Sequence, residues 1–132
     1  MDDAQLKLSN QVCFPIYSAS RLITKAYKPY LDEMGITYPQ YLVLMVLWEN
    51  DILSVNQITE KLLLNTNTLS PLLKRMERMQ LLQRNRSESD ERSVIVQLTE
   101  KGKNLKDQAK PIPDQLIKIL LTENIKISDV LQ

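Results

Sequence analysis

Residues 66–99 constrain the fold of this chain more than any other segment, because a helix with one apolar face runs directly into a charged hairpin. The apolar face repeats at intervals of three and four residues and comprises Leu69, Leu72, Leu73, Met76 and Met79. The other face carries short polar groups first and cations afterwards, namely Thr68, Ser70, Lys74, Arg75 and Arg78. Pro71 lies about one turn into the helix, where few backbone hydrogen bonds are lost, so the helix is predicted to continue through it.

Two short runs, residues 83–86 and 93–98, follow this helix and flank the polar segment 87–92. Val94, Val96 and Leu98 alternate along the second run, which predicts a strand with one buried face. A helix followed by such a hairpin is the layout of a winged helix-turn-helix, a mainly α fold with a small β-hairpin wing. In that fold, polar groups near the start of the reader helix meet bases and later cations meet phosphates. The predicted DNA contacts are Thr68, Ser70, Pro71, Lys74 and Arg75 on the helix, with Arg84, Arg86 and Arg92 in the wing.

Charge is concentrated in the same region. Residues 61–86 hold six cations and one anion, Glu77, so this window carries +5 and the rest of the chain −4, for a net charge of +1. Phosphate binding needs a local basic face rather than a high overall pI. A solvated helix beside a hairpin would carry similar charges, and the helix-then-hairpin spacing is what favours DNA binding.

Composition narrows the class further. A chain of 132 residues with 43% apolar residues is long enough for one domain with a real core. The absence of histidine and the single cysteine argue against most metal sites, histidine-based catalysis and an intrachain disulfide, so no cofactor is expected. The start of the chain does not resemble a signal peptide, and no apolar run is long enough to cross a bilayer, so a cytoplasmic protein is expected.

Helices are predicted on both sides of the reader. The first is capped by Ser9 or Asn10 and runs toward Met34, starting late or kinking near Pro15 and kinking near Pro29. The others are predicted at residues 40–49, 54–64, 99–110 and 114–121. A polar turn over residues 65–67 is expected to lead into the reader helix.

Four segments covering most of residues 10–102 resemble the MarR family of transcriptional regulators. They are NQVCFPIYSASR, TYPQYLVLMVLWE, LSPLLKRME and RNRSESDERSVIVQLTEKG. At their relative spacing, Cys13, Tyr17, Tyr27 and Tyr38 are similar to the redox-sensing residues of the one-cysteine organic hydroperoxide resistance regulators (OhrR type).

This resemblance implies a homodimeric repressor, not an enzyme, that binds a pseudo-palindromic operator and leaves it when its cysteine is oxidised by an organic hydroperoxide or another oxidant. It implies one domain over residues 1–132, in which 9–34 and 99–132 dimerise and 37–98 bind DNA. Arg92 would enter the minor groove, with Asp90 orienting it through a salt bridge across the wing turn.

The chain departs from the family pattern in two places. About eleven residues follow Leu121 where family members usually have a further long helix, which affects the expected dimer. Pro15 stands two residues after the cysteine, where a helix-friendly apolar residue is usual.

Cys13 is expected near the start of its helix, where the positive end of the helix dipole lowers a thiol pKa. Tyr17 follows it on the same helix face. Tyr27 lies about 21 Å further along a continuous helix, so it can reach only the cysteine of an antiparallel partner. By resemblance, Tyr27 and Tyr38 would donate hydrogen bonds to the partner's thiolate. Oxidation would give a sulfenic acid, then a mixed disulfide with a small thiol or over-oxidation.

Three other readings remain open. A thiol peroxidase would also use a lone cysteine, although the Pro-x-x-x-Thr-x-x-Cys pattern is absent, since Leu6 and Asn10 occupy its first two fixed positions. A MarR-type regulator could instead respond to a small aromatic ligand, with Cys13 purely structural. A winged-helix protein-interaction module would show no salt-dependent DNA binding.

Overall fold

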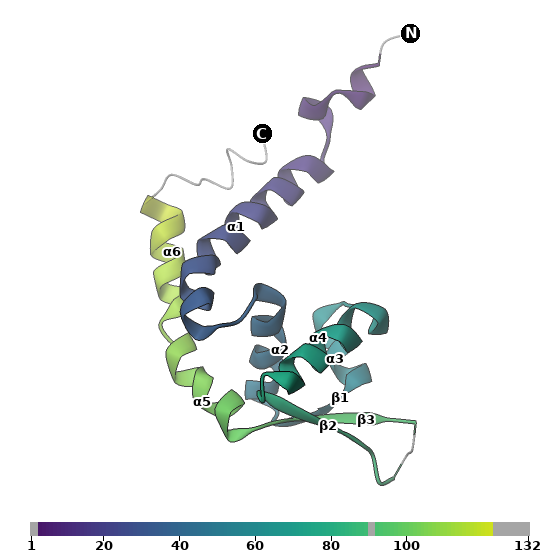
Figure 1. The fold of residues 1–132 in the computed structure, drawn as a ribbon. Helices are drawn as coiled ribbons and strands as arrows, with labels where there is room; N and C mark the ends of the chain where they lie inside the picture. The colour runs from purple at the N-terminus through teal and green to yellow at the C-terminus, as the bar shows by residue number, and fades with distance from the viewer. Residues whose placement is uncertain (1–2, 90–91, 123–132) are drawn as a thin grey trace. The chain divides into compact units, whose positions relative to one another are not determined.

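The computed structural model describes residues 3–89 and 92–122, and its contacts divide the chain into two compact units (Figure 1). The winged unit comprises Leu31–Lys110, and the terminal unit comprises Met1–Tyr30 with Pro111–Gln132. Among the described residues, no helix combines the length and the apolar character that a membrane crossing requires.

The winged unit joins helices to a small antiparallel sheet. Its elements, in chain order, are α2 (Tyr38–Glu49), β1 (Ile52–Ser54), α3 (Val55–Leu62), α4 (Thr66–Arg78), β2 (Leu82–Arg86), β3 (Val94–Leu98) and α5 (Glu100–Ala109). In the sheet, β3 lies between β1 and β2 and pairs with both. The predicted winged helix-turn-helix is confirmed, with α3 and α4 as the two helices and β2–β3 as the wing (Figure 1). Sequence reasoning missed β1, because its three residues run straight into the cap of α3.

Side-chain caps set where α3 and α4 begin. The Ser54 hydroxyl accepts the N–H of Gln57 at 3.1 Å, and the Gln57 carboxamide accepts the N–H of Ser54 at 2.8 Å. This reciprocal capping box satisfies backbone donors that a helix start leaves unpaired. The Asn65 carboxamide oxygen accepts the N–H of Thr68 at 2.8 Å. Helix α4 therefore begins at Thr66, within the segment expected to be a polar turn.

The predicted apolar face of α4 is confirmed for Leu69, Leu73 and Met76, which are buried, whereas Leu72 and Met79 are half-buried. The helix continues through Pro71. The side chains that complete this core come from α2, α3 and the sheet and include Tyr41, Val43, Leu44, Leu47, Ile58, Leu82, Val96 and Leu98. Burial of α4 along one face leaves its opposite face toward solvent.

The first turn of α5 is fastened to the α4–β2 turn. The Thr99 hydroxyl donates to the Gln80 carbonyl at 2.6 Å, and the Thr99 N–H donates to the Leu81 carbonyl at 3.1 Å. The Trp48 indole N–H of α2 donates to the Gly102 carbonyl at 3.0 Å. A Cβ atom at Gly102 would overlap the Leu81 carbonyl oxygen, so α5 approaches this turn as closely as it does only with glycine there.

The terminal unit contains most of α1 (Cys13–Met34) and α6 (Ile112–Thr122), preceded by short 3-10 turns at Ala4–Leu6 and Leu8–Asn10. Of the two alternatives at Pro15, the late start is observed, since α1 begins at Cys13 rather than after Ser9 or Asn10. The ring of Pro15 is accommodated in the first turn, where its missing N–H costs no helical bond. Helix α1 continues through Pro29 and ends before Gly35, whose φ is +72°.

Replacing Gly102 with alanine tests the α5 packing. Although alanine favours an isolated helix by about 1 kcal/mol over glycine, we expect Gly102→Ala to lower the free energy of unfolding by about 1–3 kcal/mol through steric overlap with Leu81. Urea denaturation measures the change. Asn104→Ala, at an exposed position of the same helix, is the control and should not destabilise the protein. Equal stability of Gly102→Ala and wild type would contradict the close approach.

Candidate functional site

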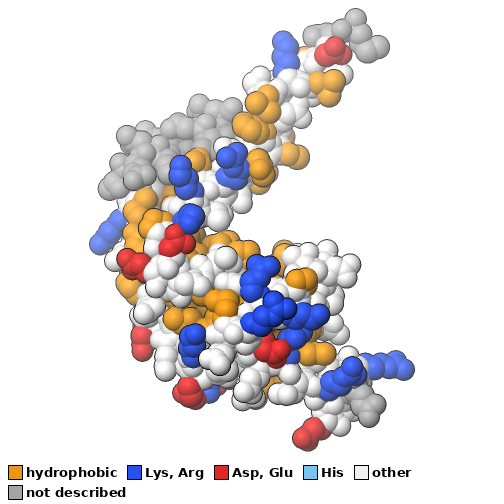
Figure 2. All heavy atoms as spheres, viewed as in Figure 1, with side chains coloured by type: hydrophobic (Ala, Val, Ile, Leu, Met, Phe, Trp, Pro, Cys, Tyr) orange, Lys and Arg blue, Asp and Glu red, His pale blue; other side chains and the backbone are white. Residues whose placement is uncertain are grey.

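The solvent face of α4 carries most of the helix residues predicted to meet DNA. Thr68, Pro71, Lys74 and Arg75 are exposed, whereas Ser70 is half-buried. Arg78 is exposed as well, so cations occupy the C-terminal half of this face. Figure 2 shows Lys and Arg side chains gathered over α4 and again over the wing. The structure thus brings the predicted helix residues onto one basic surface.

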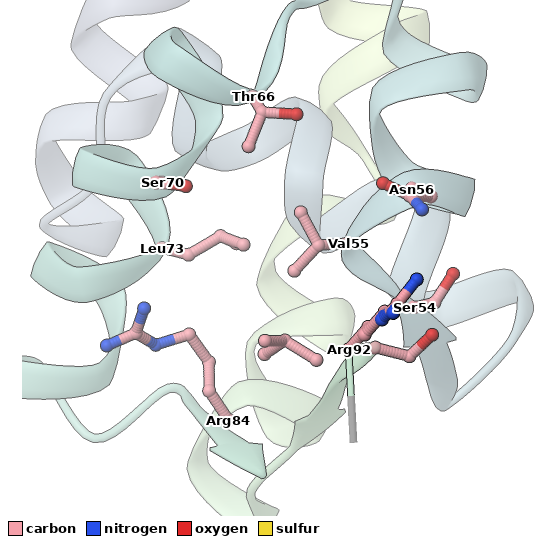
Figure 3. Close-up of a pocket in the computed structure, with 10 residues that line it drawn as sticks. Ser54, Val55, Asn56, Thr66, Ser70, Leu73, Arg84 and Arg92 are labelled. Carbon is pink, nitrogen blue, oxygen red and sulfur yellow. The ribbon is translucent and has the colours of Figure 1, made fainter. Parts of the chain in front are cut away.

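A small hollow of about 180 Å³ lies where the starts of α3 and α4 meet the wing (Figure 3). Thr66 and Ser70 of α4 line it, together with Ser54 and Asn56 from the start of α3. Sequence reasoning missed Ser54 and Asn56 as neighbours of the reader helix. No local pattern in the sequence indicates this, because it depends on the pairing of β1 with β3, which sets Ser54 opposite Ile95.

Arg84 is held by a residue of α4. Its guanidinium donates to a Glu77 carboxylate oxygen at 3.1 Å, and its backbone N–H donates to the other oxygen at 2.9 Å. The Arg84 Nε is buried and has no hydrogen-bond partner among the described residues. These contacts tie β2 to α4, so the guanidinium predicted to bind DNA is engaged within the protein.

The same pairing acts on the Glu77 carboxyl. The hydrogen bond from the Arg84 guanidinium, followed by the one from its backbone N–H, lowers the pKa of Glu77 from its ordinary value of 4.5. Glu77 is the one anion of residues 61–86, and its charge is paired with the Arg84 guanidinium of β2.

The other predicted wing residues lie near the hairpin end. Arg86 closes β2 and is exposed. Arg92 is also exposed and lines the hollow on the side opposite Arg84 (Figure 3). Asp90 lies outside the described residues, and with it the predicted salt bridge to Arg92.

The predicted sensor residues fall in both units. Cys13 is the first residue of α1, which confirms its predicted place near a helix start, and its side chain is exposed. Tyr17 is exposed one turn later, and the Arg21 guanidinium lies over its ring at 5.6 Å from the centroid. Helix α1 is continuous from Cys13 to Tyr27, so these residues are about 21 Å apart along one chain. Tyr38 belongs to the winged unit, where its ring packs against Tyr41 at 6.3 Å.

A helix-turn-helix with an outward basic face on its second helix, completed by a cationic hairpin, defines a winged-helix protein of the DNA-binding class.

Known proteins resemble this chain over most of its length. A family model described as transcriptional regulator SarA/Rot matches residues 25–109. The organic hydroperoxide resistance transcriptional regulator of Bacillus subtilis (strain 168) is 53% identical over 112 residues, which are 85% of this chain and 76% of that protein.

Solved structures of regulators are also similar to this chain. Reduced AbfR bound to DNA is 40% identical with a TM-score of 0.77, over 87% of this chain and 80% of that one. Overoxidized AbfR bound to DNA is 37% identical with a TM-score of 0.78, over 99% and 97%. AbfR, from Staphylococcus epidermidis, has also been solved with a disulfide formed. A MarR transcriptional regulator from Methanosarcina mazei Go1 is 28% identical with a TM-score of 0.67, over 84% and 77%.

The chain therefore belongs to the MarR family of DNA-binding transcriptional regulators, in the branch of the organic hydroperoxide resistance regulators. The resemblance inferred from the sequence is confirmed, and the relatives found are regulators rather than enzymes.

The Glu77–Arg84 pairing predicts a pH dependence of stability. A carboxyl whose pKa is lowered by folding stabilises the protein above its unfolded-state pKa, and this contribution is lost as pH falls through the lower folded-state value. We expect Glu77→Gln to be less stable than wild type at neutral pH, with the difference shrinking below pH 4.5. Urea unfolding across this range measures it. In an Arg84→Gln background the same change should have a smaller effect, and an undiminished effect would mean that Arg84 is not the cause.

Proposed function

We propose that this chain is a repressor that binds a pseudo-palindromic operator in double-stranded DNA as a homodimer in the cytoplasm. In this proposal α4 enters the major groove and the wing reaches the adjacent minor groove. The observation that carries it is the solvent face of α4, where polar groups precede Lys74, Arg75 and Arg78. That order suits a helix whose start meets base edges and whose later turns meet phosphates. The DNA-bound structures of AbfR support the same use of this fold.

Exposed apolar side chains support the dimer. Eight of the eleven large hydrophobic residues that are exposed in the described chain belong to the terminal unit: Leu6, Leu8, Val12, Phe14, Ile16, Tyr17, Ile117 and Leu121. Apolar surface gathered in one unit favours burial against another molecule. A homodimer covers it and supplies two reader helices for two half-sites about one DNA turn apart.

Charge removal at the basic surface tests the DNA contacts. We expect Lys74→Ala and Arg92→Ala each to weaken binding to the DNA upstream of the protein's own gene without unfolding the protein. Each lost phosphate contact should also make the negative slope of log K against the logarithm of salt concentration less steep by about 0.9. Fluorescence anisotropy over a salt series measures both quantities. Lys106→Ala, at an exposed cation of α5, is the matched control and should bind like wild type. Unchanged affinity of Arg92→Ala at physiological salt would remove Arg92 from the interface.

We further propose that Cys13 is the sensor. Its exposure at the first position of α1 makes the sulfur accessible to a small oxidant. The thiolate attacks one oxygen of an organic hydroperoxide, the O–O bond breaks, and the alkoxide leaves as an alcohol after taking a proton. The sulfenic acid then reacts with a low-molecular-weight thiol to give a mixed disulfide and water. The name of the Bacillus subtilis relative supports an organic hydroperoxide as the oxidant.

The mixed disulfide is proposed as the form that leaves the operator. Overoxidized AbfR has been solved bound to DNA, which favours disulfide formation over further oxidation as the releasing step. A disulfide adds bulk in the terminal unit, where the exposed apolar residues are proposed to meet the partner subunit. A changed dimer geometry would alter the spacing of two reader helices that must match fixed half-sites. Coupling of about 1–3 kcal/mol would weaken binding by about 5- to 150-fold.

A comparison of wild type with Cys13→Ser after oxidation tests whether Cys13 or another signal controls operator binding. With an organic hydroperoxide and a small thiol present, wild type should lose operator affinity, whereas Cys13→Ser should keep it. Fluorescence anisotropy gives the affinity, and intact mass gives the cysteine product. Tyr27→Phe and Tyr38→Phe test the proposed hydrogen bonds to the partner's thiolate, and each should slow oxidation while leaving reduced-state affinity unchanged.

The outcomes distinguish the remaining readings. A response retained in Cys13→Ser would favour a small aromatic ligand as the signal, with Cys13 structural. Catalytic turnover of hydroperoxide by the free protein would favour a thiol peroxidase. If neither wild type nor Cys13→Ser bound DNA, the repressor proposal would be wrong and a protein-interaction module would be favoured.

A further inference from the structure

Asn67 lies on the solvent-exposed face of α4. It is the second residue of the helix and is exposed. Pro71, Lys74 and Arg78 follow it by four, seven and eleven residues, which are close to whole numbers of helical turns. These four side chains therefore share one stripe, opposite the buried Leu69, Leu73 and Met76.

The neighbouring polar groups at the start of α4 are directed elsewhere. Thr66 and Ser70 line the hollow beside α3 and the wing (Figure 3). The Asn65 carboxamide oxygen is occupied as the helix cap by the N–H of Thr68. Of the amide side chains at this helix start, Asn67 is thus the one on the outward stripe. Sequence reasoning missed it, because residues 65–67 were expected to form the turn.

From this placement, and resting on the proposed DNA binding, we infer that Asn67 reads an adenine in the major groove of each operator half-site. A carboxamide presents one acceptor and two donors in a plane. Adenine presents the matching pair on its major-groove edge, the N7 acceptor and the N6 amino donor, whereas guanine presents two acceptors. The Asn67 N–H₂ donates to N7, and its oxygen accepts from the N6 amino group.

The rest of the stripe fits this assignment. Lys74 lies about 10 Å beyond Asn67 along the helix axis, and Arg78 lies about 16 Å beyond it. Cations this far from the base-reading end of a helix suit phosphates at the groove wall. A polar amide at the leading end and cations further back give one helix both base reading and backbone anchoring.

Selection from a random duplex library tests the inference. Wild type, Asn67→Ala and Asn104→Ala are each used to enrich bound sequences. Asn104 is the matched control, because it is likewise an exposed helical asparagine but belongs to α5, outside the DNA-binding surface. Wild type and Asn104→Ala should both require adenine at one position of each half-site. Asn67→Ala should lose about 5- to 150-fold of that preference and keep its preferences elsewhere.

A second measurement isolates the hydrogen bond. The enriched site is synthesised with 7-deazaadenine at that position, which replaces the N7 acceptor by C–H and leaves base pairing intact. Wild type should bind the modified site more weakly than the natural one, whereas Asn67→Ala should bind the two equally. An unchanged adenine preference in Asn67→Ala, or a uniform loss of affinity for all sequences, would overturn the assignment while leaving DNA binding in place. Failure of wild type to enrich any sequence would overturn the proposed function and this inference together.

Discussion

Burial of one face of α4 is the constraint from which the rest of the DNA-binding surface follows. With Leu69, Leu73 and Met76 in the core, the helix cannot rotate about its axis without exposing apolar side chains to water. The periodicity of the helix then decides which residues face outward. Asn67, Pro71 and Lys74 face solvent for this reason, and Thr66 and Ser70 turn toward the hollow.

The wing is aligned to this helix by pairing on both sides. Strand β3 is bonded to β1 on one edge and β2 on the other, and β1 leads directly into α3. Glu77 adds a second connection, because its carboxylate holds both the backbone and the side chain of Arg84. A wing that was joined to the domain only through its own two strands could hinge relative to α4. Two hydrogen bonds to one carboxylate oppose that movement and maintain the spacing between helix and wing on which the proposed binding to two adjacent grooves depends.

Much of this arrangement follows from local patterns in the sequence. The apolar spacing from Leu69 to Met76 and the alternation from Val94 to Leu98 report burial directly, so the helix, the strand and their order were predictable. Interactions between segments far apart in the sequence were not predictable in this way. Strand β1 is too short to show a period, and its role depends on pairing with residues about forty positions away. The engagement of Arg84 by Glu77 depends on the packing of β2 against α4. A count of charges along the sequence treats Arg84 as one more free cation.

The start of α4 shows how a small boundary error changes the interpretation of a site. Placing residues 65–67 in a turn left Thr68 and Ser70 as the leading polar groups of the reader helix. Because the Asn65 cap starts the helix at Thr66, the leading outward side chain becomes Asn67. Element boundaries depend on single capping bonds, which many polar residues could supply equally well.

The proposed switch requires that a reaction at Cys13 change the position of α4, although Cys13 and α4 belong to different units. The chain itself crosses between the units twice, within α1 at Leu31 and between α5 and α6 at Pro111. The start of α5 is hydrogen-bonded through Thr99 to the turn that follows α4, and Gly102 allows the close approach of α5 to Leu81 in that turn. A displacement carried by α5 would therefore be passed to this turn and through it to the end of α4. Densely packed elements shift between discrete arrangements instead of deforming gradually, which suits a regulator that must either match its half-sites or release them.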